Sequence, residues 1–204
     1  MNISSIKSVI AKTNFPSSRV ASALLLISAL GFTFLPVSTQ KASAGMLAAT
    51  TNLVRNASFE KDTDGDGVPN RWAGFNLTLA DKRDCNNSYA GNCSFKMVVS
   101  ASTKQLNQYI PVSGVAGDIV DLSVWTKGKD IDLGYDQIRV NAAFINTNGT
   151  STWWFVEIPA GTTPWTLRQV SAEANQDFES VLIRYQVSGI GGKVWVDKVK
   201  LVGP

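Results

Sequence analysis

The sequence predicts an all-β protein, a jelly-roll β-sandwich of about eight to ten antiparallel strands. From residue 52 onward, apolar and polar residues alternate with a period of two, and turn-forming residues separate the runs. No run longer than a few residues has the spacing of an amphipathic helix. The predicted strands are 53–59, 75–80, 95–99, 106–112, 119–127, 137–145, 152–158, 165–171, 181–187 and 193–202.

The clearest connection between two predicted strands joins 137–145 to 152–158. Between them lies Asn146-Thr147-Asn148-Gly149. Asn and Gly readily adopt the left-handed conformations that a tight turn requires. We therefore expect a β-hairpin at this position.

Residues 1–44 have the composition of a secretory signal peptide. They contain no acidic residue, have three basic residues before position 20, and continue with an apolar run at 20–35 and Ala-Ser-Ala at 42–44. Cleavage after residue 44 predicts a secreted protein, extracellular or at the cell surface. The alternative is an uncleaved membrane anchor, although Ser, Gly and Pro interrupt the apolar run.

Signal cleavage changes the charge of the chain. The whole sequence has 19 Lys and Arg against 16 Asp and Glu, a formal charge of +3. Four basic residues lie within 1–44, so the remainder has 15 against 16 and a formal charge of −1. Without a basic stripe, nucleic acid is not an expected partner.

The rest of the chain is expected to form one domain at 52–204, preceded by a short lead-in at 45–51. We expect this domain to be a monomer without membrane association.

Alternating aspartates mark a candidate calcium loop. Asp62, Asp64 and Asp66 are separated by single small residues, and Gly67 ends the run. Ca²⁺ takes about six to eight oxygen ligands, which closely spaced carboxylates can supply. Ala73 stands where an EF-hand has its bidentate Glu, so the loop is not an EF-hand. We expect a structural calcium ion, and the alternative is a solvated acidic turn.

A second acidic position lies in the last predicted strand. Strict alternation places Asp197 on the same face as the apolar Trp195 and Val199. A carboxylate facing the core needs a partner, because unpaired burial costs several kcal/mol. Our hypothesis is that Asp197 and Glu60 share a calcium ion that fastens the first strand to the last. The alternative is an Asp at the sheet rim that pairs with Lys or Arg.

Cys85 and Cys93 are the two cysteines of the chain. In an exported protein they are expected to form a disulfide that closes a short polar loop. Two free buried thiols are the alternative. A metal site at these cysteines is not expected, because the sequence has no His to complete the ligands.

Four segments follow one another along the domain: NASFE at 56–60, GDIVDLSVWTKG at 117–128, the strand that opens with Trp165, and VWVDKVKL at 194–201. Together they resemble the β-sandwich carbohydrate-binding modules with the galactose-binding-like jelly-roll fold. The resemblance implies glycan binding. It also implies a structural calcium ion held by Glu60, Asp197 and backbone carbonyls. DTDGDGVPN at 62–70 resembles a thrombospondin type 3 calcium repeat, an addition to the simplest pattern of the family.

A sugar site needs flat aromatic faces and planar polar groups, and alternation predicts where both lie. If Trp154 faces inward, its neighbour Trp153 faces outward, and Trp125 lies on the polar phase of its own strand. The alternative is that these tryptophans belong to the core or rim. We interpret Trp72, Trp165 and Trp195 as structural. The predicted ligand-binding residues, on a concave sheet face, are Trp125, Arg139, Asn141, Trp153, Glu157, Arg184 and Gln186.

We do not expect an enzyme. Without His, the chain has no triad and no general base that titrates near neutral pH. A glycosidase needs only two carboxylates, for which Glu157 with Asp136 or Glu173 would be candidates. The stronger alternative to a binding module is a calcium-stabilised structural or adhesive domain without sugar affinity.

Overall fold

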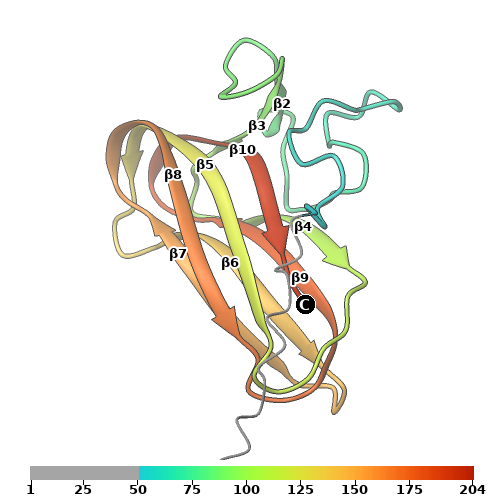
Figure 1. Cartoon of the computed structure of the whole chain (residues 1–204). Helices are drawn as coiled ribbons and strands as arrows, with labels where there is room; N and C mark the ends of the chain where they lie inside the picture. Colours follow the sequence, from blue (N-terminus) through green and yellow to red (C-terminus); the bar gives the residue numbers. More distant parts are fainter. Residues whose placement is uncertain (1–50) are drawn as a thin grey trace, which may run out of the picture. The chain divides into compact units, whose positions relative to one another are not determined.

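A computed structural model of the chain describes residues 51–204. The expected signal peptide, 1–44, and all but the last residue of the lead-in, 45–51, lie outside the described residues. Residues 51–204 form two antiparallel five-stranded sheets that face each other (Figure 1), which confirms the predicted all-β sandwich. In this part of the chain no helix is long and apolar enough to span a membrane.

The two sheets, here sheet A and sheet B, each contain strands from both halves of the domain. Sheet A has the order β1 (Ala73–Phe75), β4 (Lys104–Ile110), β9 (Phe178–Val187), β6 (Ile138–Asn146) and β7 (Ser151–Ile158). Sheet B has the order β2 (Lys82–Asp84), β3 (Ser94–Val98), β10 (Gly191–Val202), β5 (Ile119–Asp132) and β8 (Gly161–Glu173). In Figure 1, β8, β5 and β10 of sheet B lie in front of sheet A.

The core fills the space between the sheets. Leu106, Val140 and Ile183 of sheet A and Val124 and Val196 of sheet B are at most 2% exposed and belong to one hydrophobic cluster. Each sheet thus has one covered face and one outward face. This arrangement explains why the sequence alternates with a period of two.

Two predicted strands near the start of the domain are wrong. Residues 53–59 form no strand: a turn occupies 55–58, and Asn56 and Phe59 have positive φ angles of 49° and 57° that break a strand ladder. Residues 75–80 contribute only their first residue to β1, because Asn76 turns the chain with a φ of 53°. The short β2 was not predicted.

Asn52 and Leu53 nevertheless form hydrogen bonds with the backbone of β10. The side-chain amide of Asn52 donates to the Val199 carbonyl at 2.9 Å and accepts from the Leu201 N–H at 3.0 Å. The Leu53 N–H donates to the Leu201 carbonyl at 2.9 Å. The segment therefore lies beside β10, and a side-chain amide replaces part of the backbone ladder.

The predicted hairpin is confirmed between β6 and β7. The Asn146 N–H donates to the Thr150 carbonyl at 2.9 Å, and the Gly149 N–H donates to the Asn146 carbonyl at 2.9 Å. Gly149 has a φ of 81°, the left-handed conformation expected for the turn.

A buried ion pair joins the start of β4 to the loop that precedes β2. Lys104 Nζ lies 2.8 Å from Asp81 Oδ2, and the two side chains are 4% and 0% exposed. Asp81 also accepts hydrogen bonds from the N–H groups of Val98 and Thr78, each at 2.7 Å. Burial raises the pKa of the Asp81 carboxyl, but the hydrogen bonds that it accepts, foremost the one from Lys104, outweigh burial and leave that pKa below its ordinary value.

Lys104→Met should lower the free energy of unfolding by about 3 to 5 kcal/mol, because it leaves the Asp81 carboxylate buried without a cation. Urea denaturation at neutral pH measures the change. The control is Lys129→Met, which removes an exposed lysine of β5 and should change stability by less than about 0.5 kcal/mol.

Stability should also depend on pH through the same pair. The lowered pKa of Asp81 stabilises the fold at neutral pH, and this contribution is lost as pH falls below about 4 and through the pKa of the folded state. The difference in the free energy of unfolding between the wild type and Asp81→Asn should therefore disappear in acid. A Lys104→Met loss below about 1 kcal/mol would contradict the stabilising role of the pair.

Candidate functional site

The outward face of sheet A collects six of the seven predicted ligand-binding residues. Side chains that lie directly opposite each other on paired strands share a face. Arg139 lies opposite Glu157 on β7 and Gln186 on β9, and Asn141 lies opposite Arg184 on β9. Trp153 lies opposite Ala143 on β6 and therefore on the same face.

Three rows of side chains cross this outward face. Neighbouring strands are about 4.8 Å apart, so the five strands span roughly 19 Å. The rows are Trp153, Ala143, Leu182 and Tyr109; Phe155, Asn141, Arg184, Asn107 and Ala73; and Glu157, Arg139, Gln186, Gln105 and Phe75.

Arginine side chains hold the two aromatic rings that β7 contributes to this face. The Arg184 guanidinium lies over the Trp153 ring, 4.7 Å from its centroid, and that of Arg139 lies 4.0 Å from the centroid of Phe155. Arg184 reaches Trp153 across β6 at Ala143, whose side chain is small. Such cation–π contacts fix the orientation of the rings. Trp153 and Phe155 nevertheless remain 42% and 44% exposed.

Trp154 faces the opposite way from Trp153, as predicted. It lies opposite Ala142, which belongs to the core. Trp154 is still 37% exposed, because β7 is the edge strand of sheet A and has a neighbour on one side only. Its indole therefore faces inward but is only partly buried.

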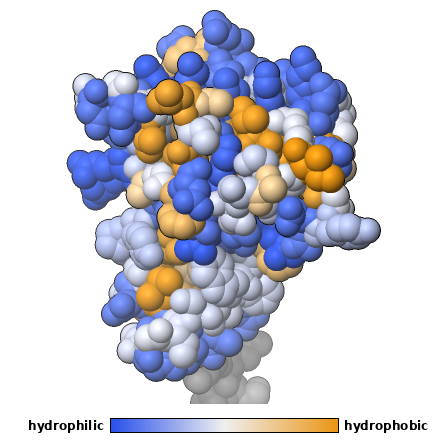
Figure 2. Space-filling model, turned by 180° about the vertical axis from the view of Figure 1, so that it is seen from behind, coloured by the Kyte–Doolittle hydropathy of each residue, from blue (hydrophilic) through white to orange (hydrophobic). Residues whose placement is uncertain are grey.

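A groove continues the outward face beyond Asn107. It has a volume of about 440 Å³ and is lined by Leu53, Arg55, Arg71, Ala73, Asn107, Gln108, Tyr109, Ile110 and Pro111. Asn107 connects the two regions, because its Oδ1 accepts a hydrogen bond from Arg184 Nε at 3.0 Å. Figure 2, the view from behind Figure 1, shows hydrophobic residues scattered among hydrophilic ones rather than one continuous apolar surface.

The structure does not bring Trp125 to this face. Its outward phase is as predicted, but β5 belongs to sheet B, so the residue lies on the opposite side of the sandwich. There Tyr89 stacks on it, with ring centroids 3.6 Å apart and planes at 12°. The Trp165 ring lies 6.1 Å from that of Tyr89.

Asp197 is buried, but not in the core. A bulge follows it in β10, where Lys198 has a φ of 47°, so Val199 returns to the core while Asp197 faces outward beside Trp125. The predicted alternation through Val199 is therefore wrong. The carboxylate is covered by the 85–93 loop, from which the N–H groups of Tyr89 and Ala90 donate to it at 2.8 and 3.0 Å.

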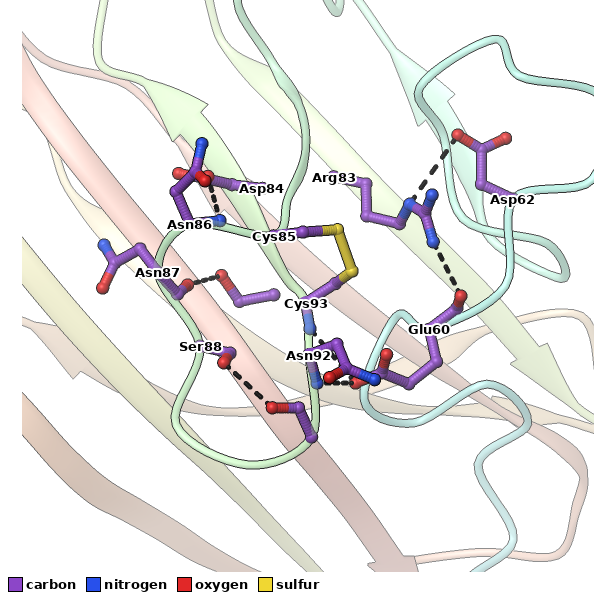
Figure 3. The surroundings of a disulfide bond; sticks show 12 residues. Glu60, Asp62, Arg83, Asp84, Cys85, Asn86, Asn87, Ser88, Asn92 and Cys93 are labelled. Atoms are coloured by element: carbon purple, nitrogen blue, oxygen red, sulfur yellow. Dashed lines mark hydrogen bonds and ion pairs between the residues drawn. A yellow bond between two sulfur atoms is a disulfide. The ribbon is translucent and has the colours of Figure 1, made fainter.

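The predicted disulfide between Cys85 and Cys93 is confirmed, and it closes the loop that covers Asp197. The Glu60 side chain also forms hydrogen bonds with this loop. The Glu60 Oε1 atom accepts hydrogen bonds from the N–H groups of Asn92 and Cys93 at 2.8 and 3.2 Å (Figure 3). Glu60 and Asp197, from opposite ends of the domain, therefore both bind this loop.

The electrostatics around Asp197 favour a cation. Burial raises the pKa of the Asp197 carboxyl above its ordinary value, the three N–H groups that bind it oppose this shift, and the charge of Glu60 raises the pKa further. Within residues 51–204, neither carboxylate forms an ion pair. Carboxylate oxygens are the ligands that Ca²⁺ prefers, so Glu60 and Asp197 are the side chains here that could supply ligands to such an ion.

The three loop aspartates form a second acidic group. One carboxylate oxygen from each of Asp62, Asp64 and Asp66 lies within 4.8 Å of the others. Arg83 separates this group from Glu60, since its Nε lies 3.9 Å from Asp62 Oδ2 and its Nη1 donates to the Glu60 carbonyl at 2.7 Å (Figure 3). The five predicted metal ligands thus lie in two places.

Sequence reasoning missed several residues of the face and groove. Phe155 shares the phase of Trp153 and Glu157, so alternation alone could have identified it. Arg55 and Arg71 lie in irregular segments, where no periodicity indicates direction. Asn107 lies on a strand that was predicted, although its face was not assigned.

No protein-family model and no curated protein matches the sequence. Solved structures do match. The chain resembles the enzymatically active domain of bacteriophage CBA120 tailspike protein 4, with 17% identity and a TM-score of 0.58 over 75% of this chain and 21% of that one. It also resembles TmCBM61 in complex with β-1,4-galactotriose, with 16% identity and a TM-score of 0.52 over 76% of this chain and 100% of that one.

A third similar structure is the CBM22-1 xylan-binding domain of Paenibacillus barcinonensis Xyn10C, with 13% identity and a TM-score of 0.52 over 76% of this chain and 96% of that one. At these identities the matches concern the fold. The chain therefore has the β-sandwich fold of carbohydrate-binding modules. It spans only about a fifth of the tailspike domain.

Proposed function

We propose that the domain is a secreted, non-catalytic carbohydrate-binding module that recognises a poly- or oligosaccharide on the outward face of sheet A. One observation carries the proposal: two exposed aromatic rings, Trp153 and Phe155, share a face with arginine and amide side chains. The fold supports it, since the similar structures include a module in complex with β-1,4-galactotriose and a xylan-binding domain.

The chemistry of the face suits sugar rings. The apolar side of a pyranose stacks on an aromatic ring, and its hydroxyls bind planar polar groups such as those of Arg184 and Gln186. The arginine contacts hold Trp153 and Phe155 in place before a ligand arrives. Binding then loses less side-chain entropy than it would with mobile rings.

Two observations favour binding over hydrolysis. The carboxylate of Glu157 is already paired with Arg139 Nη2 at 3.2 Å. Glu173, one of its candidate partners, lies on β8 of sheet B, so the two carboxylates cannot flank one glycosidic bond. Because about a fifth of a tailspike enzyme domain shares the fold, turnover of chromogenic glycosides is the direct test of catalysis.

A glycan array with the purified domain, run with and without calcium, tests the proposed function. Binding to a defined set of glycans is expected. An array without any bound glycan would favour a structural or adhesive domain.

Trp153→Ala should weaken glycan binding by about 1 to 3 kcal/mol and leave the melting temperature nearly unchanged, because the ring is an exposed aromatic anchor. Isothermal titration calorimetry with the best glycan from the array measures the loss of affinity.

Trp154→Ala is the matched control, because it removes the neighbouring indole from the inward side of the same strand. It should lower the melting temperature and preserve affinity. If Trp154→Ala loses the glycan and Trp153→Ala keeps it, the sugar binds at the open edge of the sandwich and not on the outward face of sheet A.

We also propose that Glu60 and Asp197 hold a structural calcium ion, and that Asp62, Asp64 and Asp66 bind a second one. The ion between Glu60 and Asp197 would compensate two carboxylates that have no cationic partner among the described residues. It would thereby fasten the start of the domain and the disulfide loop to β10. Its role would be stability, since Asp197 lies on the opposite sheet from the aromatic face.

Millimolar calcium should raise the melting temperature above that of a chelator-treated sample by about 5 to 10 °C, because the ion binds the folded state. Asp197→Asn keeps the acceptor oxygen for the loop N–H groups and should reduce this response. Asp64→Asn tests the aspartate loop separately. Equal melting temperatures with calcium and in a verified metal-free sample would refute both sites.

A further inference from the structure

The arginines of the face and groove outnumber their acidic partners. Arg139 and Arg184 lie on the outward face of sheet A, and Arg55 and Arg71 line the adjoining groove. Glu157 is the acidic residue in the three rows that cross the face, and it pairs with Arg139. Among residues 51–204, the other three arginines have no carboxylate within ion-pair distance.

This cationic surface contrasts with the rest of the domain. Residues 51–204 contain 15 basic and 16 acidic residues, so a patch of four arginines and one glutamate concentrates positive charge on one side. Arg139 and Arg184 are diagonal neighbours on paired strands, a placement in which like charges repel. Stability alone does not account for this arrangement, whereas an anionic ligand would compensate it.

We infer that the glycan bound by this face is acidic, with a carboxylate or sulfate group at successive sugar residues; this inference rests on the proposed function. Arginine suits such groups, because its planar guanidinium binds a carboxylate through two parallel hydrogen bonds.

Arg184 lies between the exposed Trp153 ring and the groove residue Asn107, so it could bind the acidic group of a sugar stacked on that ring. Its guanidinium lies over Trp153 on the β7 side, and its Nε donates to Oδ1 of Asn107, a groove residue on the β4 side. The two terminal nitrogens form no hydrogen bond within the described part of the chain. A sugar that contacts the exposed ring would bring its acidic group next to these nitrogens. Arg71 and Arg55 would meet an acidic group farther along the chain of sugars.

Affinity electrophoresis with matched polysaccharides tests the inference. The acidic probes are polygalacturonate and dextran sulfate, and their neutral counterparts are fully methyl-esterified polygalacturonate and dextran, with β-1,4-galactan and xylan as further neutral probes. We expect one acidic probe to bind about tenfold more tightly than its counterpart, as two or three exposed ion pairs would supply together, and to bind less tightly at high salt.

The double variant Arg71→Gln/Arg184→Gln should lose this preference. Lys129→Gln/Lys193→Gln removes the same charge from sheet B and should retain it. Arg184→Lys, which keeps the charge without the planar fork, should retain part of it. Poly-L-glutamate, an anionic polymer without sugar rings, should bind at least tenfold more weakly than the preferred acidic glycan.

The outcomes separate this inference from the proposed function. Binding of neutral glycans as tightly as acidic ones overturns the inference and leaves the module intact. A preference that survives Arg71→Gln/Arg184→Gln, or equal binding of poly-L-glutamate, also overturns it. Failure to bind any polysaccharide overturns both.

Discussion

The proposed binding face depends on one physical constraint, the burial of alternate side chains of sheet A against sheet B. Val140 and Ile183 lie in the core, while Arg139 and Arg184, their neighbours in sequence, lie outside. A slip of one residue would turn the apolar side chains to solvent and bury two guanidinium groups without partners, at a cost of several kcal/mol. The core therefore determines which side chains a ligand can meet.

A second polar centre, on the opposite sheet, depends on a break in the same alternation. The bulge after Asp197 keeps the carboxylate outside the core and lets the disulfide loop cover it. Glu60 binds this loop as well, so the start of the domain, the loop and β10 meet at two carboxylates. Because this centre and the aromatic face belong to different sheets, an ion there would stabilise the fold without touching the ligand.

Much of the face could be predicted from sequence, because a strand that packs on one side must alternate. That reasoning placed Arg139, Asn141 and Trp153 correctly. It could not assign Trp125, because alternation gives the phase of a strand but not the sheet to which the strand belongs.

The remaining differences arise where backbone geometry departs from a regular strand. At Lys198 and at Asn56 the chain adopts left-handed conformations, and composition gives no clear signal for them in residues other than glycine. The bulge at Lys198 reversed the direction expected for Val199 relative to Asp197. The groove arginines Arg55 and Arg71 were missed for a related reason, since their positions depend on turns that bring distant segments together.

The most direct test of the binding face is a nuclear magnetic resonance titration of the indole N–H signals of the six tryptophans with the glycan that the domain binds best. These signals report on both sheets in one experiment, with Trp153 on sheet A and Trp125 and Trp165 on sheet B. Binding on the outward face of sheet A predicts a large, saturable shift for Trp153 and none for Trp125 or Trp165. A saturable shift of Trp125 and Trp165 with an unmoved Trp153 signal would contradict it and place the sugar on sheet B.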